Sequence, residues 1–297
     1  MDDLSQLPTE SRNPATEDLD RLTALDLVRA LHAADREAIA AVEAELPRIA
    51  MAVDAIVARL EQDGRLFYLG AGTSGRLGVL DASECPPTFN TTPEMVQGLI
   101  AGGDIALRRS VEQAEDDEAQ GRRDLEAHTF SSKDVLIGIA ASGRTPYVLG
   151  GMKYARELGA LSIGLSCVPH SLLARAADLA ITPATGPEPV TGSTRMKAGT
   201  ATKLVLNMLS TGAMVRLGYV FGNLMVNVQP TNEKLRDRAA RIVAAVTGMG
   251  YDEAATLLQS AGSVKTAIVM KKLGIGRDDA QKRLTSAHGH LRSVLEG

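Results

Sequence analysis

A glycine-rich segment with two hydroxyl side chains follows the first apolar run of the sequence. It reads Gly70-Ala71-Gly72-Thr73-Ser74-Gly75-Arg76-Leu77-Gly78. Glycine permits a tight turn, and the start of a helix offers backbone N–H groups to an anion. Thr73 and Ser74 add two hydroxyl groups, so the segment favours a compact phosphate monoester. It lacks the Gly-Lys-Ser/Thr sequence of a P-loop, which excludes that class of nucleotide site.

A second hydroxyl-bearing turn follows the third apolar run and reads Ala141-Ser142-Gly143-Arg144-Thr145-Pro146. A proline in the first helical turn has a backbone dihedral suited to a helix start. Either turn alone is more often purely structural, but two of them at one sheet edge predict a pocket for a sugar phosphate or a similar metabolite. The predicted phosphate-binding residues are Gly72, Thr73, Ser74, Ser142, Gly143, Arg144 and Thr145.

A third segment, Gly192–Lys197, opens another predicted helix with two hydroxyl groups and two cations. We interpret Ser193, Thr194 and Lys197 as a second anion contact, with an ordinary helix cap as the equally weighted alternative. No HExxH pattern occurs among the five histidines, and the nearest pair, His288 and His290, would not share a helix face. No metal site and no cofactor are therefore expected.

The elements that position these residues follow from an alternation of apolar runs and helical stretches. Such a pattern indicates a doubly wound parallel sheet of five strands, with ligands beyond the carboxyl ends of the strands. The predicted strands are 65–70, 96–101, 134–140, 161–166 and 178–182. The helical stretches between them are 74–83, 105–127, 145–158 and 171–177.

Helices are also predicted on either side of this sheet. Residues 22–60 are helical in pattern, and Pro47 should kink that helix or start a second one. After the sheet come a long helix over 194–217, an irregular piece over 218–231, and helices over 233–246, 252–259, 263–272 and 277–295, with Asp252 and Ser263 as N-caps. The predicted organisation is an N-terminal arm (1–20), a sheet domain that includes the N-terminal helices (21–230), and a small C-terminal helical module (231–297).

Composition narrows the class of protein. The 297 residues carry a net charge of -4, which argues against a broadly basic surface for nucleic acid. No apolar run reaches the ~18 residues of a membrane span, and the acidic start is not a secretory signal. The two cysteines, Cys85 and Cys167, cannot form a disulfide framework, and Cys85 has no evident His partner. We therefore expect a cytoplasmic protein without a membrane or nucleic-acid partner.

Several motifs together resemble a known family. GAGTSGR and ASGRTP are similar to the SIS domain, whose members bind phosphorylated sugars, and this implies a flavodoxin-like α/β fold. The likeness extends over TESRNPATEDLD, DASECPPTF, QAEDDE, TGSTRMKAGTATKLVLNMLST and VNVQPTNEKL. This set resembles the N-acetylmuramic acid 6-phosphate etherases of bacterial cell-wall sugar recycling. The resemblance implies cleavage of a D-lactyl ether by elimination and hydration, giving N-acetylglucosamine 6-phosphate and D-lactate.

The resemblance also implies catalytic residues. It makes Glu84 the proton donor to the lactyl oxygen and Glu115 the base at carbon 2, with the opposite division of roles as the alternative. From the residues alone, Glu84 lies where a helix is predicted to end at Pro86-Pro87, and Glu115 lies in an acidic run on a predicted helix. Both would then be interpreted as solvated carboxylates.

The spacing of Glu84 from the first turn raises a geometric question. Ten residues separate it from Ser74, about 15 Å if all are helical. Either the helix breaks at Gly78, or Glu84 serves a phosphate held by a neighbouring subunit, and we favour an active site shared within a homodimer. Two other functions stay open on this fold: a non-catalytic sugar-phosphate sensor and an aldose–ketose isomerase.

Overall fold

The computed structural model describes residues 8–228 and 232–297. The chain divides into two compact units, and each is treated separately. The first contains the described residues up to Ser83 together with Pro93–Ser210. The second contains Glu84–Thr92 together with the described residues from Thr211 onward. Within the described residues, no helix is both long and apolar enough to cross a lipid bilayer.

The first unit is built on a parallel sheet of five strands in the order β2-β1-β3-β4-β5. The strands are β1 (Leu66–Gly70), β2 (Val96–Ile100), β3 (Val135–Ile139), β4 (Leu161–Leu165) and β5 (Leu179–Ile181). Every residue of β1 and β3 is buried, because helices cover both faces of the sheet. The prediction of a doubly wound, flavodoxin-like sheet is confirmed, and each strand lies within its predicted range.

Within residues 8–228, eleven helical elements belong wholly or in part to this unit. They are η2 (Pro14–Thr16), η3 (Leu19–Arg21), α1 (Ala24–Glu43), α2 (Leu46–Leu60), α3 (Gly72–Phe89), η4 (Gly103–Leu107), η5 (Glu112–Asp116), α4 (Glu118–Ala127), α5 (Pro146–Leu158), α6 (Leu172–Ala176) and α7 (Lys197–Arg216). Pro47 stands in the first turn of α2, so of the two alternatives, a kink or the start of a second helix, the structure shows the second.

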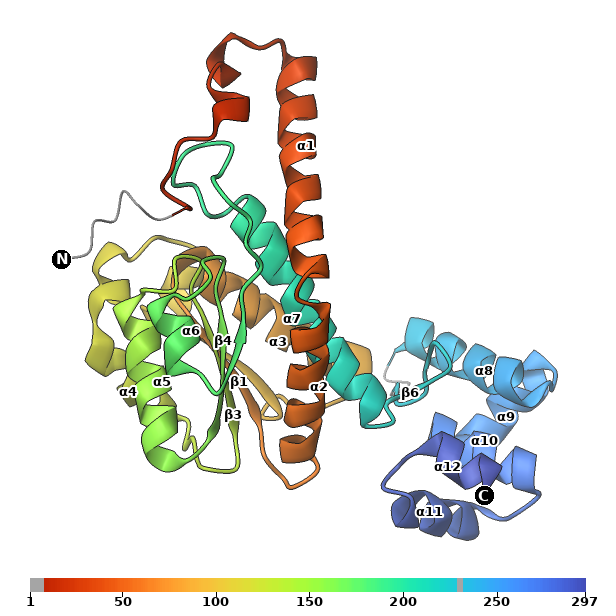
Figure 1. Ribbon diagram of the computed structural model, residues 1–297. Coiled ribbons are helices and arrows are strands. Elements are labelled where there is room, and N and C mark those ends of the chain that lie inside the picture. Colours follow the sequence, from red (N-terminus) through yellow and green to blue (C-terminus); the bar gives the residue numbers. More distant parts are fainter. Residues whose placement is uncertain (1–7, 229–231) are drawn as a thin grey trace. The chain divides into compact units, whose positions relative to one another are not determined.

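The helices form two layers around the sheet (Figure 1). On one side lie α4, α5 and α6, against which Phe67 and Leu69 of β1 pack in one apolar cluster. On the other lie α2, α3 and α7. There the buried Asp81 of α3 accepts hydrogen bonds from the Tyr68 hydroxyl at 2.8 Å and from Nδ2 of Asn207 on α7 at 2.7 Å. Asp81 thereby fixes α3 to both the sheet and α7.

Two predicted helix boundaries are wrong. Residues 105–127 are not one helix: η4, η5 and α4 replace it, because Asp117 caps α4 with a side chain that accepts from the Gln120 N–H. The helix carrying Glu84 does not end at Pro86-Pro87 but continues to Phe89. The dihedral fixed by a proline ring is itself helical, and near a helix end few backbone bonds are lost. Nor does α3 break at Gly78.

The second unit is mainly helical, as predicted. It contains a short antiparallel pair, β6 (Val220–Phe221) and β7 (Leu224–Met225), within the segment expected to be irregular, of which residues 229–231 lie outside the described part. The helices that follow are α8 (Glu233–Thr247), α9 (Tyr251–Ala261), α10 (Val264–Leu273), α11 (Arg277–Ser286) and α12 (Leu291–Glu296).

The caps in this unit differ in one place from the prediction. Ser263 caps α10 through the Thr266 N–H, as expected. The N-cap of α9 is Gly250 rather than Asp252, which lies in the first turn, where its charge still interacts favourably with the helix dipole. The predicted helix over 277–295 is divided into α11 and α12, with His288 and Gly289 at positive φ between them.

Candidate functional site

The two hydroxyl-bearing turns start side by side at the carboxyl edge of the sheet. Gly70, the last residue of β1, is in register with Ile139, the last residue of β3. The chain passes from β1 to β2 on one side and returns to β3 on the other, so the strand order reverses between β1 and β3. Open α/β sheets bind ligands in the crevice at this position.

The first turn leads directly into α3, whose first N–H groups have no partner within the helix. The residue before α3 is Ala71, whose methyl group cannot cap a helix, and the first intrahelical bond runs from the Gly75 N–H to the Ala71 carbonyl at 3.1 Å. The N–H groups of Gly72, Thr73 and Ser74 precede that bond. A Cβ at Gly75 would lie 2.6 Å from the Gly70 carbonyl oxygen, so only glycine lets α3 start this close to β1.

The second turn is fixed by Gly143. Its φ is +66°, its N–H donates to the Ala140 carbonyl at 2.8 Å, and a Cβ there would collide with Ser171. Thr145 is the N-cap residue of α5, yet its side chain makes no capping bond. The half-buried side chains of Ser142, Arg144 and Thr145 complete the turn.

The third predicted segment lies beside the first turn. A methyl group at Gly199 in α7 would contact Thr73 Cγ2 at 3.6 Å, so the start of α7 and the start of α3 are neighbours. Ser193 and Thr194 precede α7 and are half-buried. The structure thus brings the start of α7, which directly follows the third segment, next to Thr73 of the first turn.

Lys197 lies in a different environment from the one expected of an exposed helix-start lysine. Its side chain is only 1% exposed, and Nζ forms a 2.6 Å ion pair with Glu37 of α1. The backbone N–H groups of Lys197 and Ala198 donate to the buried Glu188 carboxylate at 2.8 and 2.9 Å. Burial raises the pKa of Glu188, against the opposing effect of these hydrogen bonds. A carboxylate of the chain itself therefore occupies the N-terminus of α7.

Glu115 lies in the short helix η5 and lines a cavity of about 140 Å³. Other residues of this cavity come from the turns that follow β1 and β2 and from the segment around η4. The lining residues are Ala71, Gly72, Arg76, Ala101, Ala106, Ser110, Val111 and Glu115. The structure therefore places Glu115 beside Ala71 and Gly72, at the start of the first hydroxyl-bearing turn. Arg76 was not among the predicted site residues, although it stands within the quoted GAGTSGR motif.

Glu84 is exposed on α3 and belongs to the second compact unit. It does not lie at a helix end, because α3 continues five residues beyond it. The partial charge of a helix C-terminus falls off within the last turn, and Glu84 lies more than one turn before Phe89.

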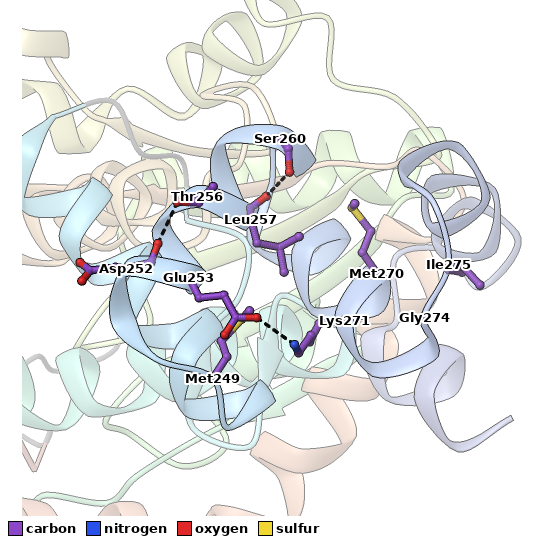
Figure 2. A pocket seen from close by; sticks show the side chains of 10 residues that line it. All are labelled: Met249, Asp252, Glu253, Thr256, Leu257, Ser260, Met270, Lys271, Gly274 and Ile275. Atoms are coloured by element: carbon purple, nitrogen blue, oxygen red, sulfur yellow. Dashed lines mark hydrogen bonds and ion pairs between the residues drawn. The ribbon is translucent and has the colours of Figure 1, made fainter.

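A larger cavity, of about 820 Å³, lies entirely within the second unit and contains none of the predicted site residues (Figure 2). Its lining is formed by α9, α10 and the segments next to them, with Met249, Leu257, Met270 and Ile275 as apolar members. Lys271 Nζ forms an ion pair with Glu253 Oε1 at 3.0 Å across it. Among the described residues, no group of three or more His, Cys, Asp or Glu side chains could hold a metal ion.

Two family models match the chain. The glucokinase regulatory protein N-terminal SIS domain matches residues 48–156, and the SIS domain matches residues 116–212. Together these ranges include the sheet, both turns, Glu84, Glu115 and the third segment. The matches agree with the α/β fold observed here.

Relatives match over nearly the whole chain. The N-acetylmuramic acid 6-phosphate etherase of Rhodopirellula baltica is 53% identical, covering 99% of this chain and 98% of that protein. The etherase of Pasteurella multocida is 54% identical, covering 97% of this chain and 96% of that protein. A solved structure from Bacteroides fragilis, described as a candidate phosphosugar isomerase involved in capsule formation, is 19% identical with a TM-score of 0.50, covering 66% of this chain and 94% of that chain. That likeness shows the fold alone.

Proposed function

The chain belongs to the N-acetylmuramic acid 6-phosphate etherases, which are carbon–oxygen lyases, and we propose that Glu84 and Glu115 perform the acid–base steps of its reaction. The observation that carries this proposal is the cavity that Glu115 shares with Gly72. A base in that cavity lies next to the backbone donors that would hold the sugar 6-phosphate. The alternatives of a sensor or an isomerase lack this full-length support.

The chemistry needs two carboxyl groups in different protonation states. In the open-chain sugar, the aldehyde at carbon 1 makes the proton on carbon 2 acidic enough for a carboxylate base. We assign that base to Glu115. Departure of the lactyl oxygen from carbon 3 needs a proton, which we assign to Glu84. Elimination leaves a double bond between carbons 2 and 3. The resulting Glu84 carboxylate then accepts a proton from the water that adds to carbon 3, while protonated Glu115 returns a proton to carbon 2, and this gives N-acetylglucosamine 6-phosphate and D-lactate.

The phosphate would be held at the carboxyl edge of the sheet. We propose that it accepts hydrogen bonds from the N–H groups of Gly72, Thr73 and Ser74 and from the hydroxyl groups of the first turn. Ser142, Gly143, Arg144 and Thr145 would bind it from the second turn, with Ser193 and Thr194 adding hydroxyl groups. Lys197 would act indirectly, because its ammonium group is paired with Glu37 and positions α1 against α7.

The assembly that we propose is a homodimer with shared active sites, working in the cytoplasm. Support comes from the continuity of α3 through Gly78. Ten residues of helix correspond to about 15 Å, farther than carbon 3 of a hexose lies from its 6-phosphate phosphorus. A Glu84 supplied by the partner subunit removes this conflict. Cys85 and Cys167 are both buried and are not joined in a disulfide, which is consistent with a reducing compartment.

Isotope experiments test the mechanism. With N-acetylmuramic acid 6-phosphate in ¹⁸O-water, we expect label on carbon 3 of the amino sugar and unlabelled D-lactate; label in lactate would contradict elimination and hydration. In D₂O, Glu115→Gln should slow hydrogen exchange at carbon 2 by roughly 10²–10⁴-fold. Glu84→Gln should keep this exchange but slow ether cleavage by a similar factor. The reverse result would exchange the two roles.

Mixing inactive variants tests the shared site. Heterodimers of Glu84→Gln with Ser74→Ala should contain one site free of both substitutions and recover activity that neither parent has. The matched control pairs Glu115→Gln with Ser74→Ala, since both residues belong to the unit that holds the sheet and would serve the same site. Stable Glu84→Gln heterodimers without recovery would contradict sharing.

A further inference from the structure

We propose that Arg76 binds the carboxylate of the substrate's lactyl group and thereby selects sugars that carry this ether. The inference rests on the proposed function, because it takes Glu115 as the base at carbon 2. Its structural basis is that Arg76 and Glu115 line the same cavity of about 140 Å³. Arg76 and Gly72 are four residues apart and so lie on one face of α3, which explains how both reach this cavity.

The guanidinium of Arg76 is held by the backbone. Its Nε donates to the Leu107 carbonyl at 3.3 Å, at the end of η4, and its side chain is half-buried. This bond uses one of the five N–H groups of an arginine. The planar fork of the remaining donors matches a carboxylate, to which arginine forms two parallel charge-assisted hydrogen bonds. A side chain fixed at Nε loses less conformational freedom when it binds such a group.

The size of the cavity indicates which part of the substrate it takes. Sites that enclose a whole drug-sized ligand measure about 300–1,000 Å³, so a cavity of about 140 Å³ takes a substituent rather than the entire sugar phosphate. The lactyl group is attached at carbon 3, next to the carbon 2 proton that Glu115 would remove. A substrate placed for that step therefore brings its lactyl carboxylate close to Glu115, and a cation in the same cavity compensates the repulsion between two carboxylates.

The other anion of the substrate has a different set of ligands. The 6-phosphate would bind at the N-terminus of α3 and the two turns, which offer hydroxyl and backbone donors. Lys197, which the sequence predicts to be part of a second anion contact, forms its 2.6 Å ion pair with Glu37 instead. Arg76 is the cation that shares a cavity with Glu115, and this favours it as the lactyl ligand.

Three ligands separate the lactyl contact from the phosphate contact. They are N-acetylmuramic acid 6-phosphate, its lactamide analogue with a neutral amide for the carboxylate, and N-acetylglucosamine 6-phosphate, which lacks the lactyl group. In Arg76→Gln we expect kcat/KM for the first to fall roughly 10–100-fold and the preference for acid over amide to disappear. The inhibition constant of N-acetylglucosamine 6-phosphate should change less than about twofold, as no lactyl contact is lost.

The controls make each outcome decisive. Arg109→Gln removes a nearby exposed arginine that does not line the cavity and should change neither ratio. Arg76→Lys keeps the charge but loses the fork, so it should give an intermediate preference even where Arg76→Gln folds poorly. An unchanged preference for acid over amide, or a parallel loss of N-acetylglucosamine 6-phosphate affinity, would overturn the assignment. Failure of the proposed function would appear separately, as absence of turnover by the wild-type enzyme.

Discussion

Replacement of Gly143 by alanine tests the geometry of the second turn most directly. The backbone there has φ of +66°, and a Cβ would collide with Ser171 at the N-cap of α6. A non-glycine residue in the left-handed region costs about 1–2 kcal/mol. Overpacking against Ser171 costs about 1–3 kcal/mol more. The lower conformational entropy of the unfolded chain with alanine offsets roughly 0.4–1 kcal/mol of this loss. We therefore expect Gly143→Ala to lower the free energy of unfolding by about 2–4 kcal/mol.

Gly159 provides a matched control on the same element. It ends α5 at φ of +72°, and a Cβ added there would meet no atom within 4 Å. Gly159→Ala should therefore lower the free energy of unfolding only through the left-handed backbone conformation, by about 1 kcal/mol. The difference between the two variants isolates the close approach to Ser171.

Hydrogen exchange on peptides from β3 and α5 is the suitable assay, because it reports the stability of the sheet unit apart from the helical unit. Gly143→Ala should also weaken binding of N-acetylglucosamine 6-phosphate, whereas Gly159→Ala should not. Equal losses of stability in the two variants would refute the steric argument. Gly143→Ala that loses stability but keeps full ligand affinity would refute the role of this turn in binding.

Three further predictions concern titratable groups. Burial alone would raise the pKa of Asp134, but the hydrogen bonds from Arg65 and others outweigh it and hold the pKa below its usual range. The contribution of Asp134 to stability should thus be complete above about pH 4 and be lost on further acidification. In urea titrations, Asp134→Asn should lower the free energy of unfolding by roughly 2–3 kcal/mol at pH 7 and make it depend less on acid. Burial lowers the pKa of Lys265 to about 8. The unfolded chain then binds the extra proton between about pH 8 and 10.4, so the stability of the helical unit should rise with pH over that window, and Lys265→Met should abolish the rise. Burial raises the pKa of the Cys167 thiol to about 12, so a disulfide reagent at pH 8 should modify it only as fast as the protein unfolds.

The sequence was sufficient for the sheet and for two of its turns. Strands buried on both faces are continuous apolar runs, so β1 and β3 could be located within a residue at each end. The glycines at 75 and 143 marked the turns because no other residue fits there. The prediction of one helix over 105–127 was wrong for a local reason. The composition favours a helix throughout, whereas the Asp117 side chain caps α4, which therefore begins only at Glu118.

Contacts between distant parts of the chain were beyond sequence reasoning. Lys197 looked like an exposed cation at a helix start, but its partner Glu37 lies 160 positions earlier, and no periodicity links the two. Glu188 was equally hidden, because a carboxylate that caps another element leaves no local pattern. Arg76 was visible within its motif, yet only the cavity that it shares with Glu115 distinguishes it from a surface arginine.

Three helices begin near the proposed phosphate position. The availability of the first backbone N–H groups in each helix indicates which of them can bind the phosphate best. The N-terminus of α7 already binds the Glu188 carboxylate through the N–H groups of Lys197 and Ala198. The first residue of α5 is Pro146, which has no N–H. Of these three helices, α3 starts with neither an acidic side chain on its first N–H groups nor a proline, so its amides are the ones best able to receive a dianion. Under the two proposals α3 then contacts both charged ends of the substrate, the phosphate at its first residues and the lactyl carboxylate through Arg76. A sugar phosphate without the lactyl group would make only the phosphate contact, and the enzyme would discriminate against it because such a sugar cannot form the ion pair with Arg76.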